Sequence, residues 1–202
     1  MNNNLDNINN ESFKTQCSQC QKCKLHTTRN NIVIGIGPCP CDLMLIGEAP
    51  GEQEDLKGEP FVGKAGKLLD QILASVDLDR KRNVYIANTI KCRPPNNRNP
   101  LPEEIYACKD WLDIQIKLVN PKIIVLSGSV AMKMAFPDRK EGITKQRGLW
   151  QKWKDIDTIV VFHPSYLLRN QSRAVGSPKW HTWQDFKAIK NALGYFEKIQ
   201  SA

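Results

Sequence analysis

The sequence lacks any apolar run long enough for a membrane helix, which needs roughly twenty consecutive apolar residues. Its N-terminal stretch, MNNNLDNINNESFK, has no apolar segment preceded by positive charge, so we expect no secretory signal. Low-complexity and collagen-like tracts are also missing, and the 41% of hydrophobic residues is close to the usual fraction for globular proteins. We therefore expect a packed cytoplasmic protein that does not interact with membranes.

Acidic residues are in short supply: 21 Asp and Glu stand against 29 Lys and Arg, which leaves a formal net charge of +8. This imbalance suits a polyanionic partner such as nucleic acid, although a basic surface can serve solubility alone. The length of 202 residues suits one domain. We expect a flexible lead-in over residues 1–16, a single domain over 17–202 and, because there is no apolar heptad, a monomer.

Short runs rich in Ile, Val and Leu predict buried strands, and apolar residues at three- and four-residue steps predict helices. The strands are expected at 43–46, 84–87, 123–126 and 158–162. The helices are expected at 68–76, 105–119 and 183–199. This alternation predicts an α/β fold of three layers, α/β/α, around a central four-stranded, largely parallel sheet.

A polar loop follows each of the four predicted strands, and these loops begin at Gly47, Asn88, Ser127 and His163. In open α/β sheets the ligand crevice lies at the carboxyl ends of the strands, so we expect the four loops to form one pocket. Turn chemistry accounts for their Gly and Pro residues. It does not account for Glu48, Asn88 and His163 at these positions.

The odd count of seven cysteines argues against a framework of disulfides, as does a reducing compartment. Cys20 and Cys23 form a CxxC pair, and Cys92 and Cys108 flank a proline-rich loop. Four thiolates suit zinc or an iron–sulfur cluster equally well, and the spacing alone does not choose between them. For Cys108 alone, a buried free thiol on the apolar stripe of its helix is a strong alternative.

The remaining three cysteines have weaker claims to a metal. Cys17 lies one step before the CxxC pair and is an alternative ligand to Cys20. Cys39 and Cys41 form a CPC sequence, a weak metal signal, and we expect both to be free thiols.

Five motifs occur in order between Cys20 and about Asp185: CQKCKLHTTR, GEAPGEQED, GEPFVGKAGKLLD, NTIKCRPPNNRNP with PEE and a later Cys, and HPSYLLRN. In this set the chain resembles the family 4 uracil-DNA glycosylases. The resemblance implies a base excision repair enzyme that flips uracil out of single- or double-stranded DNA, hydrolyses its N-glycosidic bond and leaves an abasic site. It also implies a 4Fe-4S cluster.

By this resemblance the cluster ligands are Cys20, Cys23, Cys92 and Cys108. The resemblance further implies that Phe61 stacks on the base and that backbone amides of residues 47–49 (Gly47, Glu48, Ala49) touch the base or water. Asn88 is expected to read the base edge, because an amide can donate to uracil O4 and accept from its N3–H. Cytosine reverses both groups, so the amide distinguishes the two bases.

Cleavage leaves negative charge on uracil and positive charge on the sugar. His163 is expected to donate to uracil O2 and stabilise the departing anion. A carboxylate would stabilise the sugar or orient the attacking water. Related glycosylases carry a catalytic Asp where this chain has Ala49 and a thymine-excluding Tyr where it has Gly51, so catalysis is expected from Glu48 or Glu54.

Leu167 and Leu168 are predicted to fill the hole left by the flipped base, with Arg169 on phosphate. Packing under the next helix is the alternative for one of the two leucines. The stretch RNQSRAVGSPKWHTWQD is longer than the resemblance predicts between HPSYLLRN and the closing helix. Further cations are expected on the DNA backbone: Lys64, Lys91, Arg93, Arg98, Lys145 and Arg147.

Two other classes of protein compete with the enzyme. One is a non-catalytic module that binds uracil or abasic DNA around a structural iron–sulfur cluster, and the absent Asp at Ala49 motivates it. The other is a redox or electron-transfer protein built on the cysteines. That class gives the four pocket loops no role.

Overall fold

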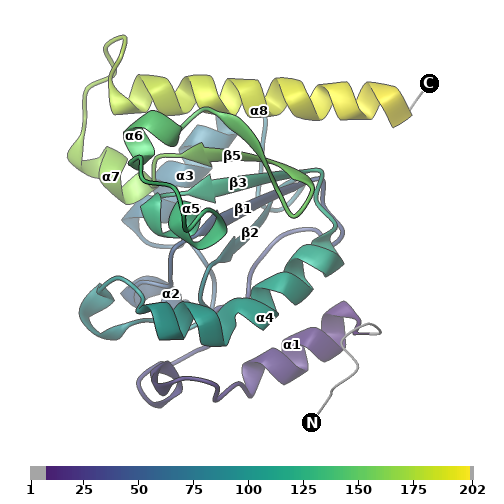
Figure 1. The fold of residues 1–202 in the computed structure, drawn as a ribbon, viewed down its shortest axis with the longest axis vertical. Helices are drawn as coiled ribbons and strands as arrows, with labels where there is room; N and C mark the ends of the chain where they lie inside the picture. Colours follow the sequence, from purple (N-terminus) through teal and green to yellow (C-terminus); the bar gives the residue numbers. More distant parts are fainter. Residues whose placement is uncertain (1–7, 201–202) are drawn as a thin grey trace.

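Five strands form one twisted sheet in a computed structural model that describes residues 8–200 (Figure 1). Their order across the sheet is β2-β1-β3-β5-β4. The bounds are β1 Leu43–Gly47, β2 Tyr85–Asn88, β3 Ile123–Ser127, β4 Trp150–Trp153 and β5 Ile156–Val161.

All four predicted strands are present and run parallel to their neighbours, with Gly47 opposite Asn88 and Leu126 opposite Val160. The sheet nevertheless has five strands instead of four, because β4 pairs antiparallel with β5 at the edge. The four residues of β4, WQKW, alternate between exposed and half-buried positions. This edge strand therefore lacks the apolar run by which the other strands were predicted.

The three predicted helices are also present, each beginning earlier than the sequence pattern indicated. The eight α-helices of the described chain are α1 Asn10–Ser18, α2 Glu52–Lys57, α3 Lys64–Ala74, α4 Pro102–Val119, α5 Ser129–Ala135, α6 Ile143–Gln146, α7 Pro164–Arg169 and α8 Pro178–Gln200. Short 3-10 helices cover Lys24–Thr27 and Pro95–Asn97. None of the helices in this part of the chain has the length and apolar character that a membrane crossing requires.

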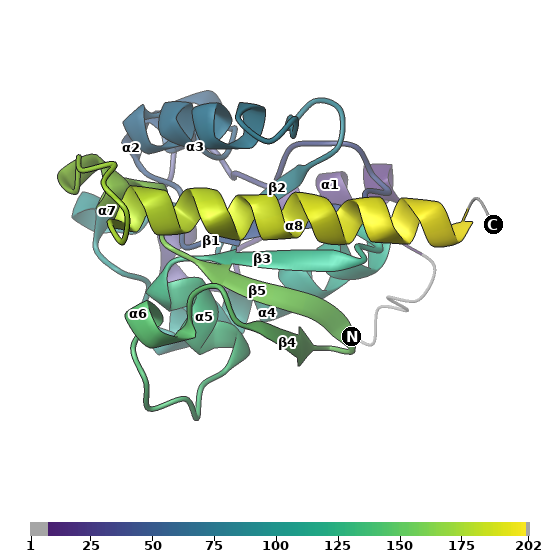
Figure 2. The same ribbon diagram turned by 90° about the horizontal axis from the view of Figure 1, so that it is seen from above.

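Helices cover both faces of the sheet, so the predicted three-layer α/β/α arrangement is confirmed (Figures 1 and 2). On one face α3 and α8 lie side by side, and Leu69 and Phe186 pack against the strands. On the other face α4 and α5 contribute Leu112 and Met132 to a second core. These layers leave the carboxyl ends of the strands to the loops.

A third apolar cluster holds α1 against α4, outside the central three layers (Figure 1). Phe13 is fully buried, and its ring centroid lies 5.9 Å from that of Trp111. Asn9 caps α1 by accepting from the backbone N–H of Ser12 at 2.9 Å. Residues 10–16 are thus ordered helix and not the flexible lead-in that we expected, while residues 1–7 of that segment lie outside the described residues.

Candidate active site and cysteine cavity

The loops after β1 and β2 are joined by backbone hydrogen bonds at the carboxyl edge of the sheet. The backbone N–H and the hydroxyl of Thr89 both donate to the oxygen of Gly47 at 2.9 Å. The N–H of Ile90 donates to the oxygen of Glu48 at 3.3 Å. These bonds fix Glu48 and the buried Asn88 relative to one another.

Phe61 connects this pair of loops to the loop after β5. Its ring centroid lies 5.6 Å from that of His163, and the two planes are inclined by 36°. A Cβ atom added to Gly47 would come within 2.6 Å of Phe61 Cζ, and one added to Gly66 would overlap the Phe61 backbone. Both glycines are therefore required for Phe61 to lie where it does.

The loop after β3 completes the convergence of the four strand ends. Gly128 has a φ of +99°, and a Cβ there would lie 3.0 Å from His163 Cβ. Its neighbour Ser127 is fully buried. Gly47, Asn88, Gly128 and His163 thus line one edge of the sheet, as the strand-end argument predicted.

Asn88 carries an unsatisfied amide oxygen. The side chain is 2% exposed, and among the described residues no group donates a hydrogen bond to its Oδ1. Buried polar atoms without a partner are uncommon in native structures and call for a ligand or a functional role. Asn88 Oδ1 is therefore suited to accept a hydrogen bond from an N–H group of a bound ligand.

His163 is held as a neutral hydrogen-bond donor. The backbone N–H of Ser165 donates to His163 Nδ1 at 3.2 Å, and the Ser165 hydroxyl lies 2.7 Å from the same atom. Burial lowers the pKa of His163 to about 4, with a smaller contribution from the nearby Arg169 and opposition from Glu54. A neutral imidazole that accepts at Nδ1 carries its proton on Nε2. The free Nε2–H can then donate to a ligand.

The two candidate carboxylates have different surroundings. Glu54 accepts from the backbone N–H groups of Val62 and Gly63, each at 2.8 Å, and from that of Gly51 at 3.1 Å. Its oxygens are thus occupied in holding two loops together. No described residue donates to the Glu48 carboxylate, and burial raises its pKa. Glu48 is the one of the two carboxylates whose oxygens are available for chemistry.

Two small residues, Ala49 and Gly51, follow Glu48 in the loop after β1. Ala49 packs against the apolar cluster that contains Phe13 and Trp111, on the side of the cysteines. A Cβ atom at Gly51 would lie 2.8 Å from Glu54 Oε2. A larger residue at Gly51 would therefore disturb the contact between Glu54 and the backbone of the same loop.

Four cysteines line a single small cavity: Cys20, Cys23, Cys92 and Cys108. Within residues 8–200 no three or more His, Cys, Asp or Glu side chains are grouped closely enough to hold one metal ion. Ligands of a cluster stand further apart than ligands of a single ion, because several iron and sulfide atoms lie between them. Four cysteines around one cavity suit the soft metals that thiolates bind, iron–sulfur clusters among them.

Nitrogen donors point at two of these sulfur atoms. Arg29 Nη1 lies 3.1 Å from Cys92 Sγ, and Trp111 Nε1 lies 3.1 Å from Cys20 Sγ. Hydrogen bonds to sulfur stabilise thiolates, and they tune the potential of an iron–sulfur cluster. The sequence analysis missed both donors. The available signals were the place of Arg29 at the end of the CQKCKLHTTR motif and that of Trp111 three residues after Cys108 on the same helix.

Lys91 lies beside the cysteines and not on the DNA-facing surface, so its predicted contact with DNA is wrong. The side chain is fully buried, and none of the described residues supplies a carboxylate to it. The titratable side chains near it are those of Cys108, Cys17 and Cys92. A buried ammonium is costly without an anion nearby. Thiolates bound to a metal cluster would provide that anion. Lys91 and the four cysteines of the cavity are therefore compatible with an iron–sulfur cluster.

The other three cysteines do not line this cavity. Cys17 is fully buried, and burial raises its pKa to about 12, so it remains a thiol. Burial also raises the pKa of Cys108 to about 11, and a cluster would have to displace its proton. Cys41 and Cys39 belong to the core between the sheet and α4. The cavity therefore favours Cys20 over Cys17 as the ligand.

The proposed DNA-contacting residues on α7 are only partly exposed. Leu167 is completely buried, so its prediction as an inserting side chain is wrong in this arrangement. Leu168 is half-buried and Arg169 is exposed. Only these two are accessible to DNA in this arrangement.

Several of the predicted backbone-binding cations are already paired. Arg98 makes a bidentate ion pair with the buried Glu104, at 2.6 and 2.9 Å. Arg147 pairs with the buried Asp185, with Nε at 2.9 Å from Oδ2. Both arginines have structural partners that the sequence analysis did not anticipate. Lys64 and Lys145 are exposed, and Arg93 is half-buried.

Comparison with known proteins agrees with this geometry. The profile described as "Uracil DNA glycosylase superfamily" matches residues 34–187. The chain is 44% identical over 163 residues to the type-4 uracil-DNA glycosylase of Thermotoga maritima, covering 80% of this chain and 84% of that relative. It is 44% identical over 158 residues to that of Archaeoglobus fulgidus, covering 74% and 78%. It is 41% identical over 185 residues to that of Sulfurisphaera tokodaii, covering 89% and 83%.

Proposed function

Because the chain belongs to the uracil DNA glycosylase superfamily, we propose that it is a base excision repair enzyme that hydrolyses the N-glycosidic bond of uracil in DNA. The observation that carries the proposal is that Asn88 and Phe61 meet at Gly47, while His163 lies against the Phe61 ring. An aromatic face, an unsatisfied amide and a neutral donor are the groups that recognition and release of uracil require. The products are free uracil and an abasic site in an intact strand.

Base recognition is assigned to Asn88 and Phe61. The Asn88 Oδ1 atom has no donor among the described residues, and it would accept from uracil N3–H while Nδ2 donates to O4. Cytosine presents an acceptor and a donor in the opposite places, and it would leave both amide groups unpaired. Stacking on Phe61 offsets part of the few kcal/mol that base flipping costs.

Departure of the uracil anion is assigned to His163. Its Nε2–H would donate to uracil O2 as negative charge develops there, in the manner of an oxyanion hole. The low pKa of His163 means that the imidazole is neutral at physiological pH. It therefore acts as a fixed donor and does not need to be reprotonated between turnovers.

Glu48 is assigned to the sugar side of the reaction. Its carboxylate would stabilise positive charge on the deoxyribose or orient the attacking water. Glu54 is a positioning residue, because its oxygens hold the backbone of residues 51, 62 and 63. We assign exclusion of the thymine methyl to Glu48 as well, since Gly51 offers no side chain for it.

We further propose that Cys20, Cys23, Cys92 and Cys108 hold a 4Fe-4S cluster. The cavity they line, the donors to Cys92 and Cys20 and the buried Lys91 support this proposal. When bound, the cluster supplies a covalent link between the N-terminal segment, the loop after β2 and α4. Purified protein should be brown and contain iron and acid-labile sulfide in equal amounts. Colourless protein with stoichiometric zinc would contradict the proposal.

The activity is tested with an oligonucleotide that contains one uracil, followed by alkali to cleave abasic sites. Strand cleavage is expected for uracil and not for thymine or hypoxanthine in the same position. If cluster-loaded protein binds the oligonucleotide without turnover and His163→Ala changes nothing, the protein is the non-catalytic module instead. The non-catalytic alternative was based on the absence of a catalytic Asp at Ala49. Glu48 is a candidate to supply the carboxylate instead, which disfavours that alternative.

We also propose that the protein acts as a monomer in the cytoplasm. The larger exposed apolar side chains are scattered over separate elements, as with Leu56 on α2, Tyr106 on α4 and Val175 before α8. Light scattering of the purified protein in solution should give the mass of one chain. A dimer mass at micromolar concentration would contradict this proposal.

A further inference from the structure

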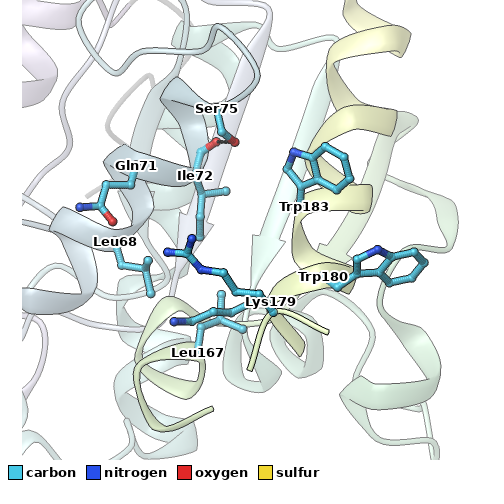
Figure 3. Close-up of a pocket in the computed structure, with 9 residues that line it drawn as sticks. Leu68, Gln71, Ile72, Ser75, Leu167, Lys179, Trp180 and Trp183 are labelled. Carbon is cyan, nitrogen blue, oxygen red and sulfur yellow. Dashed lines mark hydrogen bonds between the residues drawn. The ribbon is translucent and has the colours of Figure 1, made fainter. Parts of the chain in front are cut away.

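A cavity of about 480 Å³ lies between α3, the end of α7 and the start of α8 (Figure 3). It is separate from the strand-end loops and from the cysteines. Figure 3 shows Ile72 and Ser75 of α3 on one side and Trp183 of α8 on the other. The residues that line it are Leu68, Gln71, Ile72, Ser75, Leu167, Arg173, Lys179, Trp180 and Trp183.

The lining has the chemistry of a site for a nucleobase with its phosphate. Leu68, Ile72 and Leu167 provide an apolar floor, and Trp183 provides an aromatic face that is 41% exposed. The two charged residues of the lining, Arg173 and Lys179, have no ion-pair partner among the described residues. None of the lining residues is acidic. Proteins that bind single strands combine aromatic faces for the bases with cations for the backbone.

Further positive charge surrounds this aromatic face. Lys187 Nζ lies 4.5 Å from the centroid of the Trp183 ring. Lys179 also lines the cavity, and its Nζ donates to the side chain of Gln171 at 2.6 Å. The charged residues of the lining, Arg173 and Lys179, and Lys187 over the Trp183 ring are thus all cations. This complementarity favours an anionic occupant over an apolar peptide.

The cavity is next to the candidate active site along α7. His163 caps the N-terminus of this helix, and Leu167 lies four residues later in the cavity floor. At 1.5 Å per residue, this separation is about 6 Å along the helix axis. A strand whose uracil is bound near His163 would therefore bring an adjacent nucleotide to the cavity. The unexpectedly long segment after HPSYLLRN carries Arg173 to its rim.

We propose that this cavity binds an unpaired base of the substrate strand, next to the flipped uracil, with the base on Trp183 and its phosphate near Arg173. The inference rests on the proposed function for the identity of the strand. Because a base in a duplex is not free to enter, the cavity gives the protein a preference for single-stranded or locally opened DNA.

The test measures binding of a uracil-free, fluorescently labelled single strand, so it does not depend on glycosylase activity. Trp183→Ala is compared with Trp150→Ala, since both tryptophans are 41% exposed and Trp150 lies on the edge strand β4. Arg173→Ala is compared with Arg82→Ala, an exposed arginine before the amino end of β2. The Arg173 side chain is exposed, so its removal should leave the fold intact.

Trp183→Ala is expected to weaken binding of the single strand by about 5-fold to 100-fold, the range for one base–aromatic stack. Arg173→Ala should weaken binding and reduce its salt dependence. Both controls should bind as the wild type does. Unchanged affinity in both cavity variants overturns the proposal, and so does an equal loss in the controls or for a blunt duplex. If the protein cleaves no uracil but these differences appear, the proposed function fails while the strand-binding cavity stands.

Discussion

The Nζ atom of Lys91 donates a hydrogen bond of 2.7 Å to the backbone oxygen of Asn88. Lys91 is fully buried, and the titratable side chains near it are those of Cys17, Cys92 and Cys108. One side chain thus touches the residue assigned to base recognition and lies among the cysteines assigned to the cluster. The position of the Asn88 amide depends on groups that would hold the cluster.

Lys91→Met should lower the iron content of the purified protein and the rate of uracil release. The ammonium balances negative charge on the metal-bound thiolates and donates to Asn88, and a methionine does neither. The unfolding free energy of metal-free protein should not fall, because removing an unpaired buried charge is often neutral or favourable. Iron content and denaturant unfolding measure the two effects. Lys64→Met, an exposed change, is the control, and full iron loading of Lys91→Met would contradict the prediction.

Glu54→Gln should destabilise the protein. The carboxylate accepts from the N–H groups of Val62, Gly63 and Gly51, and an amide nitrogen in place of one oxygen would face a donor. The expected loss is about 1 to 3 kcal/mol of unfolding free energy. Denaturant unfolding measures it, with Glu52→Gln, an exposed change on the same helix, as the control. Equal stability of the two variants would show that the contacts of Glu54 do not hold the loop.

Glu48→Gln should reduce activity without reducing stability. No described residue donates to the Glu48 carboxylate, so its replacement should leave the unfolding free energy unchanged. Loss of the anion should reduce kcat by about 100-fold or more. Single-turnover cleavage of a uracil oligonucleotide measures the rate. A fully active Glu48→Gln protein, beside a stable but inactive Glu54→Gln protein, would exchange the roles assigned here.

The sequence predicted the parts of the fold that are buried on both faces. Residues 43–46 and 123–126 are continuous apolar runs because helices cover both sides of β1 and β3. The edge strand β4 is half exposed, so it has no such run. Helix α1 presents only Phe13 and Cys17 to the interior, too few apolar positions to distinguish it from a polar tail.

The sequence predicted which loops form the site but not the individual contacts that their side chains make. The carboxyl-edge rule placed Asn88 and His163 at the same edge of the sheet. The sequence could not show that Glu54 is occupied by N–H groups 8 and 9 residues away. Nor could it show that Leu167 is buried, because Leu168 next to it has the same chemistry and a different environment. Such choices depend on the packing of α7 against α3.

His163 gives the last prediction, a dependence of stability on acid. Its pKa is about 4 in the folded protein, against 6.5 for a free side chain. Above pH 6.5 the imidazole is neutral in both the folded and the unfolded state, so it adds nothing to the pH dependence of the unfolding free energy. Between these two values the unfolded chain binds a proton that the folded protein does not, so the unfolding free energy should fall as pH decreases.

His163→Gln, which cannot titrate, should lack this part of the dependence of the unfolding free energy on pH. Denaturant unfolding of both proteins from about pH 7 to about pH 5 measures the difference, and effects of acid on other groups cancel in it. Parallel curves for the two proteins would mean that the folded pKa of His163 is not lowered, and the imidazole would then not be a permanently neutral donor.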